Sequence, residues 1–521
     1  MITLHLGRRP RSKTILLHPA WLIVPAGLIA CVLIGLMQGS LQSVQLAMML
    51  LGLGLAVLWI GLVAVRPEAA LLLYAVFAVN LNSVDLPLSI GGLRLSPDIV
   101  LTTLLIVGTL LRLLTTRQSV GALPVTLPYL LFLAVPMVTL LWSPTKVESL
   151  RGIVRFIGYY ALMWLIVDAI RNRQQVRRMV VALIVSLVIP IGSGFFQAAT
   201  GGGQLLWAGA LMNRIYGFAG GPFTLAYYLV MLIPLLLVFF LAEREQEDPI
   251  FQMDGQVVIR ETGDSEGLWH FSRFWLGLLL VAAVVALLLT FIRGAWFALV
   301  ISLIVLGLAR RSLRFRQLVF TIPAAVVVVL VTFSSVLNRL TEVSDPNSTF
   351  FGRMEIWKLA WDWITSSPLR LLAGVGMKAF EYYYILLAGP TTEGLYWRRE
   401  SFLVGNRPHN ELLGFTLDVG LIGTVAFIAV LVLLVRLAIR VYRRSPDPSL
   451  QLVALAFVIG ATGLFVGAMG DNVFSQPSVA VYFWIMAGLV MAIDRHMLPD
   501  SETPDLTNDV NVSSQRQSQA D

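Results

Sequence analysis

The stretch PFTLAYYLVMLIPLLLVFFLA, residues 222–242, contains no charged side chain. An α-helix needs roughly 20 apolar residues to cross the hydrocarbon core of a bilayer, so this stretch predicts a membrane-spanning helix. The rest of the chain has the same character, since 57% of its 521 residues are hydrophobic and only 13% are charged. A soluble domain carries about 25% charged residues. We therefore expect an all-α polytopic membrane protein.

Further apolar stretches flank this one on both sides. Together they predict about 12 to 14 transmembrane helices, of which those at 67–81 and 294–309 are short. The expected spans lie near residues 20–38, 43–65, 67–81, 97–114, 124–142, 150–170, 178–198, 222–242, 274–291, 294–309, 317–336, 412–435, 449–470 and 477–494. Basic residues before the first span resemble a signal peptide, but the apolar segments that follow at once favour a retained helix.

Arginine residues are distributed unevenly among the predicted connections. With the N-terminus in the cytoplasm, the clusters at 171–178, 310–316 and 436–444 all fall on the cytoplasmic side, as the positive-inside rule requires. The short connections on the other side carry almost none. This orientation accounts for the net charge of +8, so we expect no nucleic-acid partner. Both termini are then cytoplasmic.

Three polar segments lie outside the predicted bilayer. Residues 243–273 form a cytoplasmic loop, residues 337–411 form one large external loop, and residues 499–521 form a tail whose composition predicts disorder. The expected organisation is N-terminal transmembrane helices at 1–204, a central region with both loops at 205–440, C-terminal transmembrane helices at 441–498 and a disordered cytoplasmic tail at 499–521.

The large external loop contains a helical pattern between Phe350 and Ile364. Met354, Trp357, Trp361 and Ile364 recur at spacings of three, four and three residues, and charged residues fall on another face. This periodicity predicts an amphipathic helix. Aromatic residues on such a helix are typical of the headgroup boundary of a membrane.

His409 is the only histidine that the predicted topology places outside the cytoplasm. It lies in the segment Arg407-Pro408-His409-Asn410-Glu411, directly before a predicted span. A lone histidine is more often structural than catalytic. Neutral imidazole is nevertheless the natural proton acceptor near pH 7, so His409 is a candidate general base at the membrane surface.

Two arginines lie at the mouths of predicted spans on the same side as His409. Arg293 stands in the turn between the spans at 274–291 and 294–309, and Arg214 precedes the span at 222–242. Arginine near bilayer depth is costly and is usually paired or functional. The alternative for Arg293 is an arginine that reaches from a tight turn to the membrane surface. Because guanidinium groups bind phosphate oxygens bidentately, the set predicts a lipid diphosphate and an acceptor hydroxyl as ligands.

Other chemistries lack the residues that they need. Cys31 is the only cysteine, and neither a His-x-x-His pair nor a phosphate-binding Gly-x-x-x-x-Gly-Lys loop occurs. Metal-dependent oligosaccharyltransferases typically carry a Trp-Trp-Asp triplet, which Trp361-Asp362-Trp363 does not match. We therefore expect no metal site and no cofactor.

Several of these segments together resemble the O-antigen ligase and O-antigen polymerase superfamily, whose members share a Wzy-type C-terminal domain. The resemblance is strongest over residues 205–440. The matching pieces are Arg214 with Gly221-Pro222-Phe223-Thr224; Arg293-Gly294-Ala295-Trp296; Arg353 and Trp357 with Ser367-Pro368 and Gly374-Val375-Gly376; and Pro408-His409-Asn410 with Gly420 and Gly423. Two positions depart from the family pattern. Asp418 stands where glutamate is common, and Ile292 stands where serine is common.

The resemblance implies a metal-independent, inverting glycosyltransferase of GT-C-type architecture. Such an enzyme moves a glycan from an undecaprenyl-diphosphate carrier to an acceptor hydroxyl. By matching, Arg214 and Arg293 hold the diphosphate and His409 is the general base. Residues in or beside the same motifs are candidates for supporting roles, namely Arg353, Arg407, Asn410 and Glu411. The implied location is the outer face of the bacterial inner membrane.

The acceptor distinguishes the functions that remain open. Transfer to a lipid A-core sugar defines a ligase, transfer to a growing glycan chain defines an O-antigen or exopolysaccharide polymerase, and transfer to protein is a third outcome. The partners expected in the first two cases are a polyprenyl-diphosphate-linked glycan donor, a lipid-core or growing glycan acceptor and the bilayer itself. A transporter of lipid-linked sugar is the alternative of a different class. Transporters place charges near the bilayer midplane, whereas here the charges gather at the ends of spans.

Overall fold

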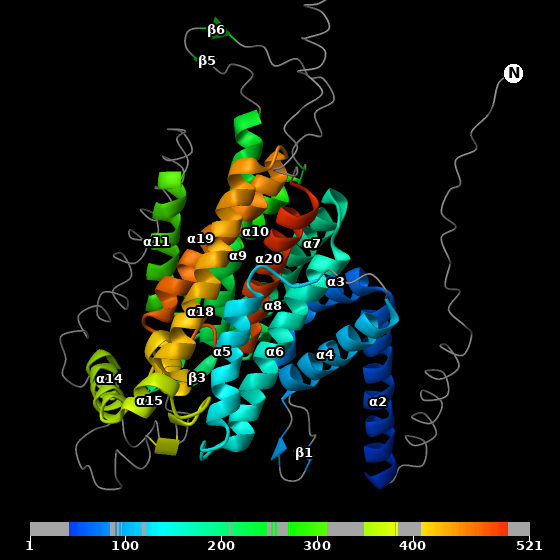
Figure 1. Ribbon diagram of the computed structural model, residues 1–521. Coiled ribbons are helices and arrows are strands. Elements are labelled where there is room, and N and C mark those ends of the chain that lie inside the picture. Colours follow the sequence, from blue (N-terminus) through cyan, green and yellow to red (C-terminus); the bar gives the residue numbers. More distant parts are fainter. Residues whose placement is uncertain are drawn as a thin grey trace, which may run out of the picture.

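The computed structural model in Figure 1 describes residues 41–83, 89–90, 93–94, 96–116, 121–207, 210–246, 252–253, 256–257, 269, 271–309, 349–380, 382–383 and 408–498. Helices dominate it. Several predicted features lie outside the described residues. They are the spans at 20–38 and 317–336, most of the loop at 243–273, residues 337–348 and 384–407 of the external loop, which include Arg407, and the tail at 499–521.

The described helices are α2 (Leu41–Val65), α3 (Pro67–Phe77), α4 (Pro97–Thr115), α5 (Thr126–Thr139), α6 (Lys146–Ala169), α7 (Arg173–Ser186), α8 (Val188–Thr200), α9 (Pro222–Gln246), α10 (Arg273–Leu289), α11 (Arg293–Ala309), α14 (Thr349–Thr365), α15 (Pro368–Ala373), α18 (Glu411–Arg444), α19 (Pro448–Ala468) and α20 (Pro477–His496). Single 3-10 turns occur at η1 (Asn80–Ser83) and η2 (Gly217–Ala219).

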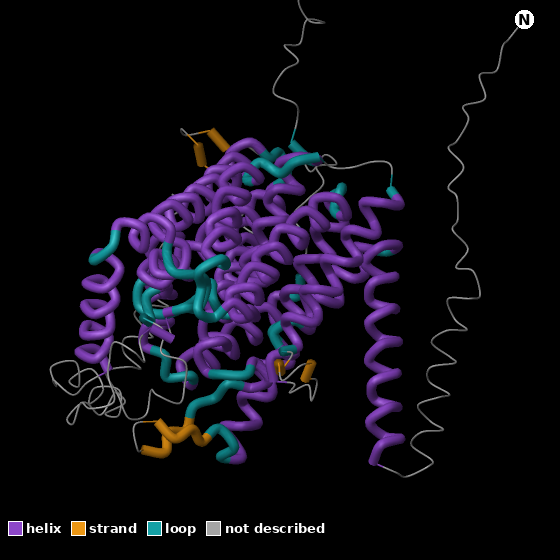
Figure 2. Tube along the Cα trace, turned by 60° about the horizontal axis from the view of Figure 1, so that its bottom comes forward, coloured by secondary structure: helices purple, strands orange, loops and turns teal. Residues whose placement is uncertain are grey.

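Strands occur only as three short antiparallel hairpins among the described residues. They pair β1 (Ser89–Ile90) with β2 (Leu93–Arg94), β3 (Gln204–Trp207) with β4 (Ala210–Asn213), and β5 (Gln252–Met253) with β6 (Gln256–Val257). In the β3–β4 hairpin Gln204 lies opposite Asn213. The hairpins connect helix ends and form no layer of their own (Figure 2).

The prediction of an all-α polytopic membrane protein is confirmed. Seven described helical stretches are long and apolar enough to cross a membrane, and five shorter apolar helices accompany them. Each predicted span within the described residues coincides with one of these twelve.

The predicted span at 178–198 is a helix pair, α7 and α8, with Pro190 just after the junction. Proline has no amide hydrogen for the preceding turn, which explains a break there. The predicted amphipathic helix corresponds to α14.

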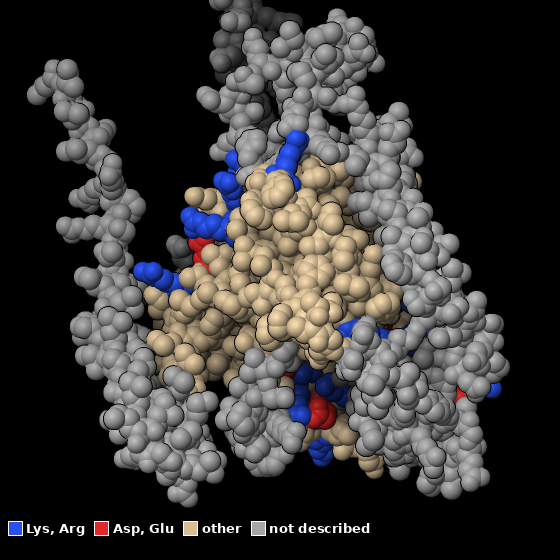
Figure 3. Space-filling model, turned by 180° about the vertical axis from the view of Figure 1, so that it is seen from behind, with Lys and Arg blue, Asp and Glu red and all other residues tan. Residues whose placement is uncertain are grey.

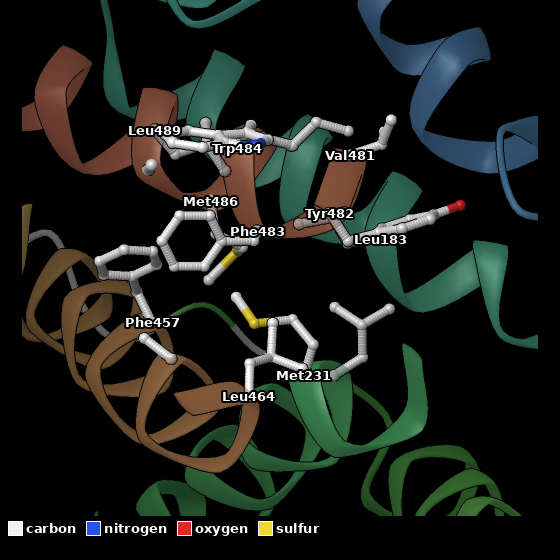
Figure 4. Close-up of a cluster of buried hydrophobic side chains, with 14 of the residues drawn as sticks. Leu183, Met231, Phe457, Leu464, Val481, Tyr482, Phe483, Trp484, Met486 and Leu489 are labelled. Carbon is white, nitrogen blue, oxygen red and sulfur yellow. The ribbon is translucent and has the colours of Figure 1, made fainter. Parts of the chain in front are cut away.

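The centre of the bundle is built around α9 and α20, which are almost completely buried. Figure 4 shows Trp484, Tyr482 and Phe483 of α20 packed with Met231 of α9 and Phe457 of α19. Helix α19 presents small residues to its neighbours, so that its backbone approaches α9 and α11 closely. Close approach through small residues is the usual way in which helices associate in a membrane. This core holds the helix ends that carry the candidate site.

The charged side chains gather mostly toward the two ends of the bundle. Figure 3 shows an uncharged band across the middle of the visible described surface. At the end opposite to His409, Arg112 of α4 and Arg171 both pair with the buried Asp168 of α6, and Arg173 pairs with Asp447. An uncharged band between charged ends is the pattern expected of a protein solvated by lipid at its middle.

Helices α14 and α15 form a cap on α18 at the end of the bundle that carries His409 (Figure 1). Gly420 interrupts α18 with φ 64°, which breaks the regular helix within the span. A Cβ atom on Gly420 would overlap the carbonyl group of Leu372 in α15, so only glycine permits this approach. The amide groups of Val375 and Gly376 then donate to the carbonyl groups of Leu417 and Asp418, at 2.9 and 3.0 Å. The cap is therefore attached to the break in α18.

Candidate functional site

His409 lies in a short turn that begins α18. The side chain of Asn410 caps the helix, because its Oδ1 accepts a hydrogen bond from the amide of Leu413 at 3.1 Å. His409 itself has φ 48°, in the left-handed region that residues other than glycine rarely adopt. Such conformations are held by their surroundings and concentrate at functional sites. The cap and the turn together fix the position of the imidazole relative to α18.

Asp471 is the partner of His409. Its Oδ1 lies 3.4 Å from the imidazole Nδ1, and the side chains are 34% exposed for His409 and 9% exposed for Asp471. Oδ1 also accepts a hydrogen bond from the amide of Asn472 at 2.9 Å. A carboxylate facing Nδ1 favours the tautomer with its proton on Nδ1, which leaves the Nε2 lone pair as the basic site. A buried acid behind a partly exposed imidazole is the arrangement of a directed general base.

Glu411 holds the segment that carries Asp471. Its carboxylate is buried and accepts hydrogen bonds from the amide of Phe474 at 2.9 Å and from the hydroxyl of Ser475 at 2.5 Å. These contacts join the first turn of α18 to the connection between α19 and α20. Because Glu411 follows His409 by two residues, the same turn positions both His409 and the loop that carries Asp471.

Helix α14 contacts this site at two points. The guanidinium of Arg353 donates to the carbonyl of Gly470 at 2.8 Å, directly before Asp471. One turn further along α14, the indole of Trp357 donates to the carbonyl of Pro408, directly before His409. The cap helix thus bonds to the backbone beside each member of the His409–Asp471 pair.

Arg293 is the first residue of α11 and follows a tight turn. Phe291 has φ 55°, and the hydroxyl of Thr290 accepts a hydrogen bond from the amide of Ile292. The indole of Trp296 donates to the carbonyl of Leu287 at 3.0 Å and thereby ties α11 back to α10. A helix N-terminus carries partial positive charge, and Arg293 adds a full charge there. The turn therefore offers an anion two sources of attraction.

Arg214 lies next to that turn. The strand end that carries it packs on the end of α10, since the amide of Ile215 donates to the carbonyl of Leu289 at 3.2 Å. The side chain of Arg214 is largely buried, with 6% of the residue exposed. We refer to Arg214 and Arg293 with the turn between α10 and α11 as the arginine corner.

Tyr227 of α9 contacts both the first turn of α11, which carries Arg293, and the end of α19, which precedes Asp471. A Cβ atom on Gly294 would lie 3.0 Å from the Tyr227 hydroxyl, so this hydroxyl reaches the first turn of α11. The ring of the same tyrosine packs against Gly467 of α19, four residues before Asp471. The structure therefore brings the arginine corner, Arg353 and the His409–Asp471 pair to one end of the bundle, around a buried tyrosine.

Most of the site residues predicted from the sequence lie at the end of the bundle that carries His409. Arg214, Arg293, Arg353, His409, Asn410 and Glu411 all lie at this end of the bundle, and Arg407 lies outside the described residues. Asp418 has a structural contact, since its Oδ1 accepts a hydrogen bond from the amide of Lys378 at 3.0 Å. Ile292 is buried in the turn before α11.

Asp471 and Tyr227 were not predicted from the sequence. A signal for Asp471 was present, because Gly470-Asp471-Asn472 stands in the short connection between the last two predicted spans, on the same side as His409. Tyr227 carries no such signal, since it lies within an apolar span. Among the residues that the structure describes, no group of three histidine, cysteine, aspartate or glutamate side chains could hold a metal ion.

A comparison with protein families finds a match in the middle of the chain. The family model described as O-antigen ligase matches residues 278–428, and a search of curated proteins finds no match. The matched segment contains Arg293, α14, His409 and Gly420, whereas Arg214 and Asp471 lie outside it. Residues 278–428 are therefore similar to the O-antigen ligase and polymerase superfamily, which supports the resemblance seen in the sequence motifs.

Proposed function

We propose that the protein is a membrane glycosyltransferase of the O-antigen ligase type. It transfers a glycan from an undecaprenyl-diphosphate carrier to a hydroxyl group of a lipid A-core sugar. The observation that carries this proposal is the His409–Asp471 pair, which lies at the same end of the helical bundle as the arginine corner. The match of the O-antigen ligase family to residues 278–428 supports the same reaction class.

The proposed reaction begins with His409. Nε2 takes the proton of the acceptor hydroxyl, and the hydroxyl oxygen attacks the anomeric carbon of the donor glycan. The Asp471 carboxylate accepts the hydrogen bond from Nδ1 and stabilises the imidazolium that forms. A positioned general base of this kind contributes typically 10²–10⁴-fold to a rate. The proton remains on His409 until solvent removes it.

The arginine corner acts on the leaving group. As the new bond forms, the bond between the anomeric carbon and the diphosphate oxygen breaks, and its electron pair stays on the diphosphate. Arg214, Arg293 and the N-terminus of α11 stabilise this charge, which is the usual role of fixed cations in transfer reactions. Attack from the face opposite to the diphosphate inverts the anomeric configuration. This proposed chemistry needs no metal ion.

The proposed orientation places the site on the external face of a bacterial inner membrane, with both termini in the cytoplasm. It rests on the positive-inside rule and on the arginine clusters at 171–178 and 436–444, at the opposite end of the bundle. The prenyl chain of the donor then lies in the bilayer while its diphosphate reaches the helix ends that carry the arginines.

A reconstituted transfer assay tests the proposal. The purified protein is given an undecaprenyl-diphosphate glycan, alone and then with lipid A-core, and glycan size is followed on a gel. A single shift that requires lipid A-core is the expected result, and it should survive EDTA. A ladder without lipid A-core would identify a polymerase instead. Absence of covalent transfer, together with uptake of the lipid-linked sugar into proteoliposomes, would contradict the proposal in favour of transport.

A further inference from the structure

An open groove runs beside His409 on the side of the cap helix. It has a volume of about 380 Å³ and lies between α14 and the first turns of α18. Its lining residues are Trp357, Trp361, Asn410, Leu412, Leu413 and Thr416. We refer to this feature as the tryptophan groove. None of its six residues has a part in the reaction proposed above.

Helix α14 relates the groove to the rest of the site. Arg353, Trp357 and Trp361 follow one another at intervals of four residues, so they lie along one face with about 6 Å between neighbours. Arg353 bonds to the backbone beside Asp471, and Trp357 bonds to the backbone beside His409. Trp361 reaches the groove. The turn of His409 therefore lies between the Asp471 side and the groove.

This order assigns the groove to the acceptor. Tyr227 packs against Gly467, just before the Asp471 segment, and its hydroxyl reaches the turn of Arg293. The donor diphosphate belongs at that turn in the proposed reaction. The acceptor must approach His409 from a different direction, because its oxygen attacks the anomeric carbon opposite to the diphosphate. The tryptophan groove borders the His409 turn through Asn410 and lies further along α14 than the contact of Arg353 with the Asp471 segment.

The lining of the groove is chemically matched to a sugar ring. A pyranose has a face of C–H groups and a rim of hydroxyl groups. The negative face of an indole attracts such C–H groups, and Trp361 is 53% exposed and available for this contact. Asn410 uses its Oδ1 for the helix cap, and no described residue accepts a hydrogen bond from its Nδ2. That amide group can donate to a hydroxyl of the ring. Leucines alone would fit a lipid chain, but the indoles and the amide favour a sugar.

We propose that the tryptophan groove binds a sugar ring of the acceptor and delivers its hydroxyl to His409. This inference rests on the proposed function and deepens it, because it names the acceptor subsite. Trp361 supplies the stacking face, Asn410 supplies a hydrogen-bond donor, and Trp357 fixes one wall against the backbone of Pro408.

The test replaces Trp361 by alanine and measures steady-state transfer with each substrate varied in turn. Trp361→Ala should raise the KM for lipid A-core about three- to tenfold, because the free energy of one aromatic contact corresponds to a change in affinity by about that factor. The KM for the undecaprenyl-diphosphate glycan should stay unchanged. Deacylated core oligosaccharide, which has sugars but no lipid, should inhibit wild-type transfer, and its inhibition constant should rise in the variant by the same factor.

Trp142→Ala is the matched control. Trp142 is 42% exposed and follows α5 at the same end of the bundle, but it does not line the groove. An equal effect of both substitutions would overturn the inference and indicate general anchoring at the membrane surface. A raised donor KM in Trp361→Ala would overturn it in favour of a site for the prenyl chain. Loss of transfer in His409→Ala, measured in the same assay, keeps the proposed function separate from the fate of this inference.

Discussion

At the scale of single residues, the candidate site depends on one carboxylate behind one imidazole. In the proposed reaction Asp471 contacts no substrate, and its role is to favour the tautomer of His409 in which Nε2 is the proton acceptor. Its own position depends on Glu411 and Arg353, which bond to residues on either side of it. The reactivity of His409 therefore depends on a short loop 62 residues further along the chain.

Asp471→Asn should lower kcat by about 10²–10⁴-fold, the usual contribution of a positioned base, and leave the KM of both substrates near the wild-type values. The amide can present its N–H to Nδ1 and thereby favour the wrong tautomer. Asp362→Asn is the control, because Asp362 is an exposed carboxylate on α14 at the same end of the bundle. Wild-type kcat in Asp471→Asn would show that this carboxylate does not direct the imidazole.

The arginine corner makes a separate prediction about the donor. Arg293→Ala should weaken binding of the undecaprenyl-diphosphate glycan more than Arg293→Lys does. Lysine keeps the positive charge but cannot donate two parallel hydrogen bonds to the phosphate oxygens. The donor KM, or direct binding in detergent, distinguishes the three proteins. Equal donor binding in wild type and both variants would remove Arg293 from the diphosphate site.

At the scale of elements, the break in α18 attaches the cap to the bundle. Gly420 and Gly374 are both in the left-handed region, and each approaches the backbone of the other segment so closely that a Cβ atom would overlap it. The cap helix α14 in turn bonds to the backbone beside His409 and beside Asp471. The glycine motif after His409 thus has a structural reason, which is to bring a separate segment of the chain onto the site.

Gly420→Ala should break the contact between α18 and the cap helix α15. The substitution places a side chain at φ 64° and against the carbonyl of Leu372, so we expect a loss of more than about 1 kcal/mol in stability and a loss of transfer. Thermal unfolding in detergent and the transfer assay measure the two effects. Gly192→Ala is the control, since a Cβ at this helical glycine of α8 meets no atom within 4 Å. Equal Tm values for the two variants would contradict the role assigned to the break.

At the scale of the whole molecule, the sequence predicted the spans well because the bilayer imposes their length. Uncharged stretches such as 222–242 can only be helices when lipid surrounds them, and α9 occupies that stretch. The amphipathic helix at 350–364 was equally visible, because tryptophans recur on one face of it. The position of the break between α7 and α8 was missed, although Pro190 marks it.

The convergence of the site could not be predicted in the same way. Arg214, Arg293 and His409 were expected on one side of the membrane, but what lies between them depends on how α9, α11 and α19 pack. Tyr227, which packs between the first turn of α11 and the end of α19, sits in an apolar span where nothing in the sequence distinguishes it from a core residue. Periodicity and charge specify which end of the bundle a residue occupies, whereas packing decides which residues meet there.

The role of His409 is tested first by glycan transfer with purified wild type and His409→Ala, side by side, with undecaprenyl-diphosphate glycan and lipid A-core. We expect that wild type forms a covalent glycan product and that His409→Ala forms none, while both proteins show the same elution volume and unfolding temperature. Wild-type turnover in His409→Ala would contradict the central claim that this imidazole is the base of a glycosyl transfer reaction.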